Sequence, residues 1–221
     1  MADQKHFVLI GLGSFGSALA CKLKVNGCRV TGIDADAVRV EDLKDVLFEA
    51  VIGDGTDRDS LEPLGLQRAT AVVISMGEDI TRSLLATLHA KELGARHIMV
   101  KGVTQEHGKI LKSLGVDRVV FPEIEIANQL ADRLTWPNVI DYLPIDSEHS
   151  FVEIAVPDSL AGRTLIDCDL RKRYGIWVVG AKDALTGKLT MFPEGSFMMN
   201  DDQMLLVVGK ESDLAKLRKN L

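Results

Sequence analysis

Short apolar runs alternate with longer amphipathic segments from residue 6 to about residue 122. The runs are rich in β-branched residues and read HFVLIG, RVTGID, EAVIGD, TAVVIS, HIMVKG and RVVFP. Between them, apolar side chains recur at helical spacing, as in Leu84, Leu85 and Leu88 before Gly94. Strands that alternate with helices form a parallel sheet covered on both faces. We therefore predict an α/β fold whose first domain, residues 1–137, is a Rossmann-like, doubly wound parallel sheet of six strands.

One further helix is expected after the sixth strand, in the segment EIEIANQLADRLTW, and it ends at Trp136-Pro137. Its apolar side chains form a stripe along one face, which Ile126 widens. A stripe this broad packs on more than one side. Two interpretations stay open from the pattern alone: the helix packs only on its own sheet, or it also contacts a second subunit.

The pattern changes after this helix. Strand-like stretches follow one another, reading NVIDYLPI, SFVEIAV, GIWVVGAK, KLTMF and QMLLVVGK, with short helices expected near residues 164–174 and 212–221. This order of elements predicts a small α+β module over residues 138–221, with the domain boundary near Asn138.

The best-defined candidate site is the sequence GLGSFG, which follows the first strand and opens a helix. Gly11 permits a tight turn, Gly13 lets the backbone approach a phosphate, and Gly16 lets helix and strand pack closely. The start of the helix, at Ser14 and Phe15, offers backbone N–H groups and partial positive charge to an anion. A glycine turn kept only for tight packing is the weaker interpretation.

Asp34 ends the second strand, eighteen residues after Gly16. At that place a carboxylate can accept hydrogen bonds from both ribose hydroxyls of an adenosine, and it would repel a 2′-phosphate. The glycine turn and Asp34 together predict an adenine nucleotide such as ATP, ADP or NAD, and disfavour NADP. Arg39 could allow NADP to bind by pairing with its 2′-phosphate, but an arginine on an early helix is usually solvated.

Further candidates end the third, fourth and fifth strands, at the carboxyl edge where doubly wound folds bind ligands. The GDGTD turn could form hydrogen bonds with the edge of an adenine, and the lysine that ends the fifth strand could bind a phosphate or a carboxylate. Ordinary turn residues and solvated side chains explain these positions nearly as well. The candidates are Asp54, Gly55, Thr56, Ser75, Gly77 and Lys101.

Composition narrows the classes of function. A net charge of −6 over 221 residues argues against a nucleic-acid partner. The longest early uncharged stretch, residues 7–21, is too short and too rich in glycine to span a bilayer, so we expect a soluble chain without a signal peptide. The three cysteines lack paired spacing, which is typical of a reducing compartment, and we expect them to be small buried side chains.

The side chains that catalysis would need show no recognisable arrangement. The five histidines are scattered, no Tyr-x-x-x-Lys pattern occurs, and no metal-ligand or nucleophile spacing stands out. We therefore expect the nucleotide to act as a regulatory signal and not as a reagent, and we expect the protein not to be an enzyme. A small NAD-dependent oxidoreductase and a free nucleotide sensor with a non-channel partner remain the alternatives.

A family resemblance is carried by FVLIGLGSFGSALA, VTGIDAD, AVIGDGTD, VKG, LGVDRVVFPE and GRTLIDCDLRKRYGIWVVGAKD, in this order. The chain resembles the cytosolic RCK (regulator of potassium conductance) subunits of Ktr/Trk-type potassium uptake systems over essentially its whole length. The resemblance implies a regulator that binds ATP or ADP, or NAD(H) in some members, and gates a separate integral-membrane potassium channel or transporter. It places the protein in the cytoplasm, at the inner face of the membrane, through that partner.

The same resemblance implies details of assembly and binding. The helix over residues 123–136 would join paired subunits, and the dimers would form a ring that we expect to be octameric. Glu123 matches a family glutamate that helps hold a divalent cation at the subunit interface. Ser14 stands where Ktr-type members typically have an arginine that reaches the phosphates. Without that arginine, ADP, AMP and NAD remain alternatives to ATP as the ligand. The stretch LIDCDLRKRYG implies a cyclic dinucleotide site in the C-terminal module.

Overall fold

A computed structural model describes residues 4–135 and 139–220 of the chain. These residues form two units, with the boundary between Pro122 and Glu123. Helix α6 (Pro122–Thr135), which the sequence assigns to the first domain, groups with the second unit. Its expected end at Trp136-Pro137 lies outside the described residues.

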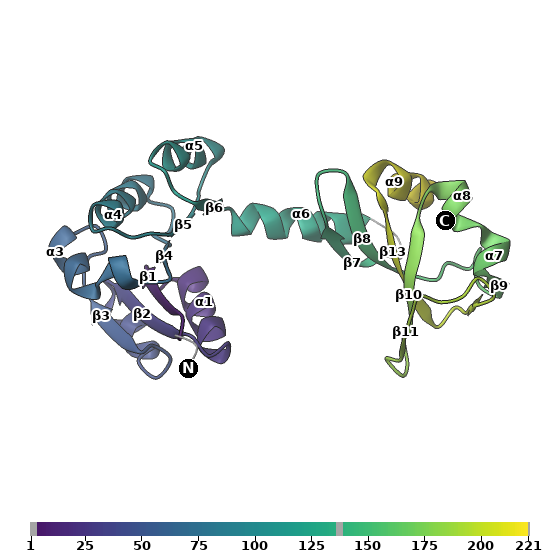
Figure 1. Ribbon diagram of the computed structural model, residues 1–221, viewed down its shortest axis with the longest axis horizontal. Helices are drawn as coiled ribbons and strands as arrows, with labels where there is room; N and C mark the ends of the chain where they lie inside the picture. Colours follow the sequence, from purple (N-terminus) through teal and green to yellow (C-terminus); the bar gives the residue numbers. More distant parts are fainter. Residues whose placement is uncertain (1–3, 136–138, 221) are drawn as a thin grey trace. The chain divides into compact units, whose positions relative to one another are not determined.

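The first unit is built on a parallel sheet of six strands, as predicted, and their order in the sheet is β3-β2-β1-β4-β5-β6 (Figure 1). The chain order reverses between β1 and β4, and at such a point the carboxyl ends of the strands open a crevice for ligands. The strands are β1 (His6–Ile10), β2 (Arg29–Asp34), β3 (Glu49–Ile52), β4 (Ala71–Ile74), β5 (Ile98–Lys101) and β6 (Arg118–Val120).

Helices cover both faces of this sheet, which is why its strands are continuous apolar runs. Along β1, Val8 and Ile10 join the core under α3, α4 and α5, while Leu9 joins the core under α1 and α2. The helices are α1 (Ser14–Val25), α2 (Ala37–Asp42), α3 (Arg58–Leu61), α4 (Ile80–Glu92) and α5 (Gln105–Ser113), with 3₁₀ turns η1 (Glu62–Leu64) and η2 (Leu66–Arg68).

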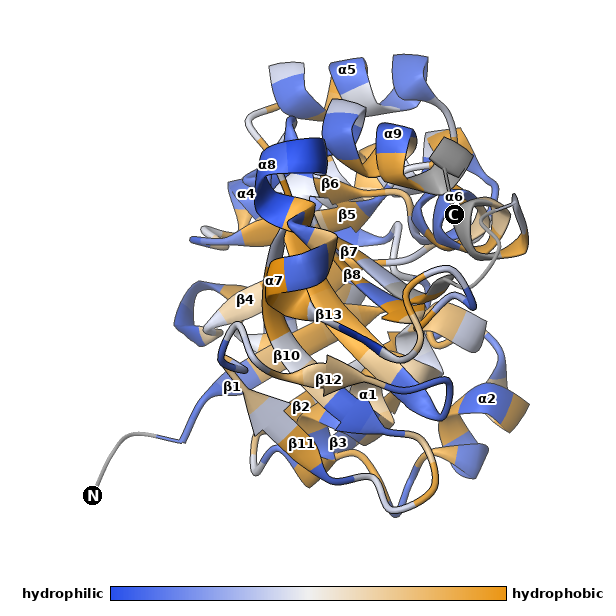
Figure 2. Ribbon diagram, turned by 90° about the vertical axis from the view of Figure 1, so that its right-hand side faces the viewer, coloured by the Kyte–Doolittle hydropathy of each residue, from blue (hydrophilic) through white to orange (hydrophobic). Residues whose placement is uncertain are grey.

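The second unit contains an antiparallel sheet of five strands in the order β11-β10-β13-β8-β7, and a two-stranded pair, β9 with β12. Val152 and Leu205 from the sheet share a core with Leu170 and Leu214 from the helices. Apolar residues concentrate along β10 and β13 in Figure 2. The elements are β7 (Val139–Pro144), β8 (His149–Ala155), β9 (Arg163–Thr164), α7 (Leu165–Cys168), α8 (Leu170–Tyr174), β10 (Trp177–Asp183), β11 (Leu189–Met191), β12 (Met198–Met199), β13 (Gln203–Lys210) and α9 (Glu211–Asn220).

The cysteines do not all behave as expected. Cys168 is buried and Cys28 is partly buried, but Cys21 is exposed. The prediction that all three are buried is wrong for Cys21, because its position on α1 is turned away from Gly16 and Ala20, the buried residues of that helix. Among the described residues, no helix has both the length and the apolar character that crossing a membrane requires.

Candidate functional site

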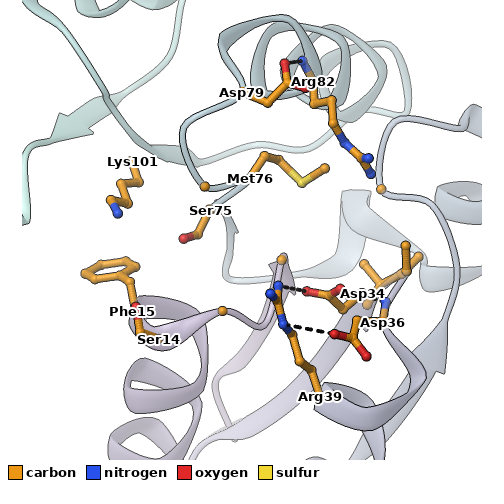
Figure 3. A pocket seen from close by; sticks show the side chains of 16 residues that line it. Ser14, Phe15, Asp34, Asp36, Arg39, Ser75, Met76, Asp79, Arg82 and Lys101 are labelled. Carbon is orange, nitrogen blue, oxygen red and sulfur yellow. Dashed lines mark hydrogen bonds and ion pairs between the residues drawn. The ribbon is translucent and has the colours of Figure 1, made fainter.

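A pocket of about 590 Å³ opens at the carboxyl edge of the parallel sheet (Figure 3). Its size lies within the range of pockets that bind small molecules and cofactors. Residues from the ends of β1, β2, β4 and β5 and from the loop after β3 line it. The lining contains many residues expected from the sequence: Gly11, Gly13, Ser14, Phe15, Asp34, Gly55, Ser75, Gly77 and Lys101.

The turn after β1 depends on the absence of a side chain at Gly11. This residue has a φ of +97°, and a Cβ built on it would lie 2.1 Å from the carbonyl oxygen of Ser75. The Gly11 N–H donates to the carbonyl of Ile33 at 2.9 Å. Gly11 therefore lets β1 pass between its two neighbouring strands and still turn sharply into α1.

Gly16 and Gly13 have different surroundings. A Cβ on Gly16 would lie 2.1 Å from the Gly11 carbonyl oxygen, so Gly16 packs behind the turn and is not among the residues that line the pocket. A Cβ on Gly13 would have no neighbour closer than 3.8 Å, where the Nη1 atom of Arg39 lies. The open backbone at Gly13 is the part of the turn that a phosphate can approach.

Helix α1 begins at this turn without a capping side chain. Gly13 is its N-cap residue and supplies no side-chain hydrogen bond. The next four helices are each capped by a side-chain oxygen, from Asp36, Asp57, Asp79 and Thr104. No N-cap side chain therefore bonds to the first N–H groups of α1. These groups can donate to an anion, as they do at anion-binding helix N-termini.

The Asp34 carboxylate is nearly buried, with 10% of the side chain exposed. Its Oδ2 accepts the Leu12 N–H at 2.7 Å, and its Oδ1 accepts the Asp36 N–H at 2.9 Å. Each carboxylate oxygen has a second lone pair, so Asp34 can still accept a bond from a ribose hydroxyl. Asp34 consequently holds the glycine turn to β2 as well as lining the pocket.

Arg39 lies over the pocket, which corrects the expectation of a freely solvated side chain. Its Nη1 is 3.6 Å from Asp34 Oδ2, and its Nε is 3.4 Å from Asp36 Oδ2. Because α2 starts at Ala37, Arg39 lies one turn beyond Asp36 and faces both carboxylates. The side chain remains about half exposed, at 53%, so its charge is available to a ligand.

The opposite side of the pocket is formed by Arg82, on α4 (Figure 3). Its Nη2 lies 2.9 Å from Asp54 Oδ1, which also accepts the N–H and the hydroxyl of Thr56. The hydrogen bonds from the Thr56 N–H and hydroxyl lower the pKa of the Asp54 carboxyl; burial opposes them, and the charge of Arg82 adds a smaller lowering effect. Asp54 and Thr56 bind each other beside the pocket and are not among its lining residues.

Several lining residues escape sequence reasoning. Asp36 and Asp79 carry a signal that could have found them, because each is an acidic residue directly before an amphipathic helix. Arg82 has no such signal, whereas Met76 lies between the expected residues Ser75 and Gly77 at the end of the fourth strand. The lining as a whole contains three cations and three carboxylates: Arg39, Arg82, Lys101, Asp34, Asp36 and Asp79.

Glu123 is not among the residues that line the pocket. It lies in the first turn of α6, in the second unit. Within the described part of the chain, His, Cys, Asp and Glu side chains do not gather in threes at a distance suited to one metal ion.

The strand order and the glycine turn at its reversal point define a Rossmann-type dinucleotide-binding fold. Two family models match the chain, the TrkA-N domain over residues 7–122 and the TrkA-C domain over residues 151–221. The chain therefore belongs to the RCK family of proteins that join a TrkA-N to a TrkA-C domain, as its motifs predict.

Similar proteins match over nearly their whole length. "Ktr system potassium uptake protein C" of Bacillus subtilis is 37% identical over 99% of this chain and 98% of its own. "Ktr system potassium uptake protein A" of Vibrio alginolyticus is 30% identical over 98% of each chain.

Solved structures show the same fold. The GsuK RCK domain superposes with a TM-score of 0.68 at 20% identity, over 99% of this chain and 48% of that one. A structure of GsuK bound to ADP matches with a TM-score of 0.50 at 25% identity, over 59% of this chain and 34% of that one.

Proposed function

We propose that this protein is a nucleotide-responsive regulatory subunit of a potassium uptake system. The observation that carries the proposal is the pocket itself: an uncapped helix start, the open backbone of Gly13 and the Asp34 carboxylate meet at one edge of the sheet. Two relatives of nearly equal length that are named potassium uptake proteins support the assignment to potassium transport.

The ligand we propose is ATP or ADP, with NAD(H) and AMP as the alternatives. Its phosphates would approach Gly13 and the start of α1, and its ribose would meet Asp34. Arg39 would supply a charge that Ser14 lacks, because its Nη1 lies 3.8 Å from the position that a Cβ on Gly13 would take. The ADP complex of GsuK, an RCK protein of the same fold, supports this choice.

Regulation requires that the nucleotide favour one arrangement of paired subunits over another. Helix α6 exposes Ile124, Ile126, Leu130 and Leu134 to solvent in the single chain. We propose that this stripe pairs two subunits, that the dimers form an octameric ring, and that the ring contacts an integral-membrane channel or transporter from the cytoplasm. A divalent cation near Glu123 and a cyclic dinucleotide at the stretch LIDCDLRKRYG, residues 165–175, belong to the same proposal.

The alternative, a small NAD-dependent oxidoreductase, would use the same pocket but predicts a different experimental result. A regulator binds NADH without consuming it, whereas an oxidoreductase oxidises it when a carbonyl substrate is present. The full-length likeness to potassium uptake proteins favours the regulator.

Competition calorimetry with ATP, ADP, AMP and NAD tests the proposal. We expect affinities in the micromolar range, roughly −8 kcal/mol, and loss of binding in Asp34→Ala. Arg58→Gln is the matched control, because Arg58 is a charged residue of the same unit that is absent from the pocket lining. The proposal fails if no nucleotide binds, or if the protein does not alter potassium uptake through a co-expressed membrane partner.

A further inference from the structure

A second cavity, of about 620 Å³, lies at the amino ends of β1, β2 and β3, at the sheet edge opposite the glycine turn. We call it the amino-edge pocket. Ligands of doubly wound folds normally bind at the other edge, so the family fold does not by itself account for a cavity here. Its charged and aromatic lining comes from Lys5, His6, Arg29, Phe48, Glu49 and Arg68.

The positive charges of this pocket lack carboxylate partners. In the described part of the chain, neither Lys5 nor Arg29 nor Arg68 forms a salt bridge, although most other charged clusters of the unit do. The single acidic residue of the lining, Glu49, accepts the hydroxyl of Thr31 at 3.3 Å through Oε2. The protein has a net charge of −6, yet the amino-edge pocket has three cationic side chains and one carboxylate.

Arg29 is held in position by stacking. Its guanidinium carbon lies 3.6 Å from the centre of the Phe48 ring. Its Nε is buried and has no hydrogen-bond partner among the described residues. A buried donor without a partner is unfavourable, and a charged acceptor that entered the pocket would remove that cost.

Arg68 is positioned by a glycine. A Cβ built on Gly65 would lie 2.6 Å from Arg68 Nη2 and 3.2 Å from its Cζ. Gly65 also has a φ of +63°, which favours glycine. The backbone at Gly65 therefore leaves room for the Arg68 guanidinium at the rim of the cavity.

We propose that the amino-edge pocket binds a small, multiply charged oxyanion, either a phosphate ester or a polycarboxylate. Unpaired arginines in a concave site are suited to such groups, because each guanidinium can form two parallel hydrogen bonds to one phosphate or carboxylate. Anion binding would offset the repulsion between Arg29, Arg68 and Lys5. This ligand is independent of the nucleotide at the glycine turn, so either proposal can fail without the other.

His6 provides a local reporter for the site. Its Nε2 lies 2.9 Å from the Thr31 hydroxyl. Burial, and then the charge of Arg29, lower the pKa of His6; Arg68 lowers it further and Glu49 acts in the opposite direction. A bound anion adds negative charge beside the imidazole, so the pKa of His6 should rise when the pocket is filled.

Nuclear magnetic resonance of the His6 ring in the full chain tests this inference, with pyrophosphate and citrate as probes. We expect saturable shifts of the His6 signals and a raised pKa with at least one probe, and the stronger probe identifies the class of oxyanion. Arg29→Gln and Arg68→Gln should each weaken that binding about tenfold, the effect of one charge-assisted hydrogen bond. Lys44→Gln, on the exposed surface of the same unit, should have no effect.

Three results would overturn the inference. One is the absence of saturation at millimolar probe. Another is binding that depends on Arg39 of the first pocket and not on Arg29 or Arg68. The third is a change in self-association of the Arg29 and Arg68 variants without any response to anions, which would make this surface a contact between subunits. Circular dichroism of both variants verifies that they remain folded.

Discussion

Three glycines of one turn have three different physical requirements. Gly11 combines a positive φ with a close approach to Ser75, Gly16 contacts the turn from behind, and a Cβ on Gly13 would have no neighbour closer than Arg39 Nη1, at 3.8 Å. The sequence motif alone suggests these separate roles, but only the distances show which glycine tolerates a methyl group.

This contrast yields a paired prediction. Gly11→Ala should lower the free energy of unfolding by about 3 kcal/mol or more, because a strained backbone and a clash with the Ser75 carbonyl add together. Gly13→Ala should leave the thermal midpoint almost unchanged and weaken nucleotide binding, since its methyl group occupies the path of the phosphate. Urea unfolding and calorimetry measure the two effects. Equal destabilisation by both changes would contradict this reading of the turn.

We propose that Ser14 influences the preference between nucleotides. An arginine at this position would add a charge at the start of α1, where a third phosphate needs one. We expect Ser14→Arg to raise the preference for ATP over ADP about fivefold, the low end of usual coupling energies. Ala18→Arg adds the same charge one turn further along the exposed side of α1 and serves as control. A strong ATP preference in the wild type that Ser14→Arg leaves unchanged would show that Arg39 or Lys101 already supplies that charge.

Asp54 gives the stability of the first unit a dependence on pH. Hydrogen bonds from Thr56 and the charge of Arg82 lower its pKa below the usual value of 3.8. A carboxyl whose pKa is lower in the folded state stabilises the protein above its unfolded pKa, and this contribution is lost as the pH falls through the folded pKa. Asp54→Asn should therefore lower the thermal midpoint at neutral pH, and the difference from wild type should shrink below pH 3.8. A difference from wild type that does not change with pH would contradict this account of Asp54.

At the scale of elements, the hydrophobic pattern predicts the six parallel strands and the five longer strands of the second unit well. The pattern is clearest where a strand buries a row of side chains, as β4, β8 and β13 do. It misses β9 and β12, which pair over two residues and have too few positions to show a period. The same limit applies to the pocket. Glycines and strand-end residues follow from the motif, whereas Arg39 and Arg82 reach the site through helix geometry that no spacing reveals.

Helix α6 is the element through which we propose that two subunits pair. Ile126 and Leu130 are 61% and 53% exposed in the single chain. Ile126→Asp should weaken self-association at least tenfold, about the effect of an unpaired carboxylate in an apolar interface. Val25→Asp, at an exposed apolar position on α1, is the matched control. Sedimentation equilibrium distinguishes the outcomes, and a wild type that is monomeric at micromolar concentration would exclude the dimer.

At the scale of the molecule, the two units have separate cores, and the glycine-turn pocket belongs entirely to the first. A nucleotide that binds only the folded first unit should stabilise that unit by about 2.7 kcal/mol at a hundredfold excess over its Kd. Differential scanning calorimetry should then show ADP raising one of two transitions. Leu170→Ala, which opens the core of the second unit, should lower the other transition, by about 2 to 5 kcal/mol. If ADP and Leu170→Ala shift one common transition, the units unfold together, and nucleotide binding in the first unit is thermodynamically coupled to the core of the second.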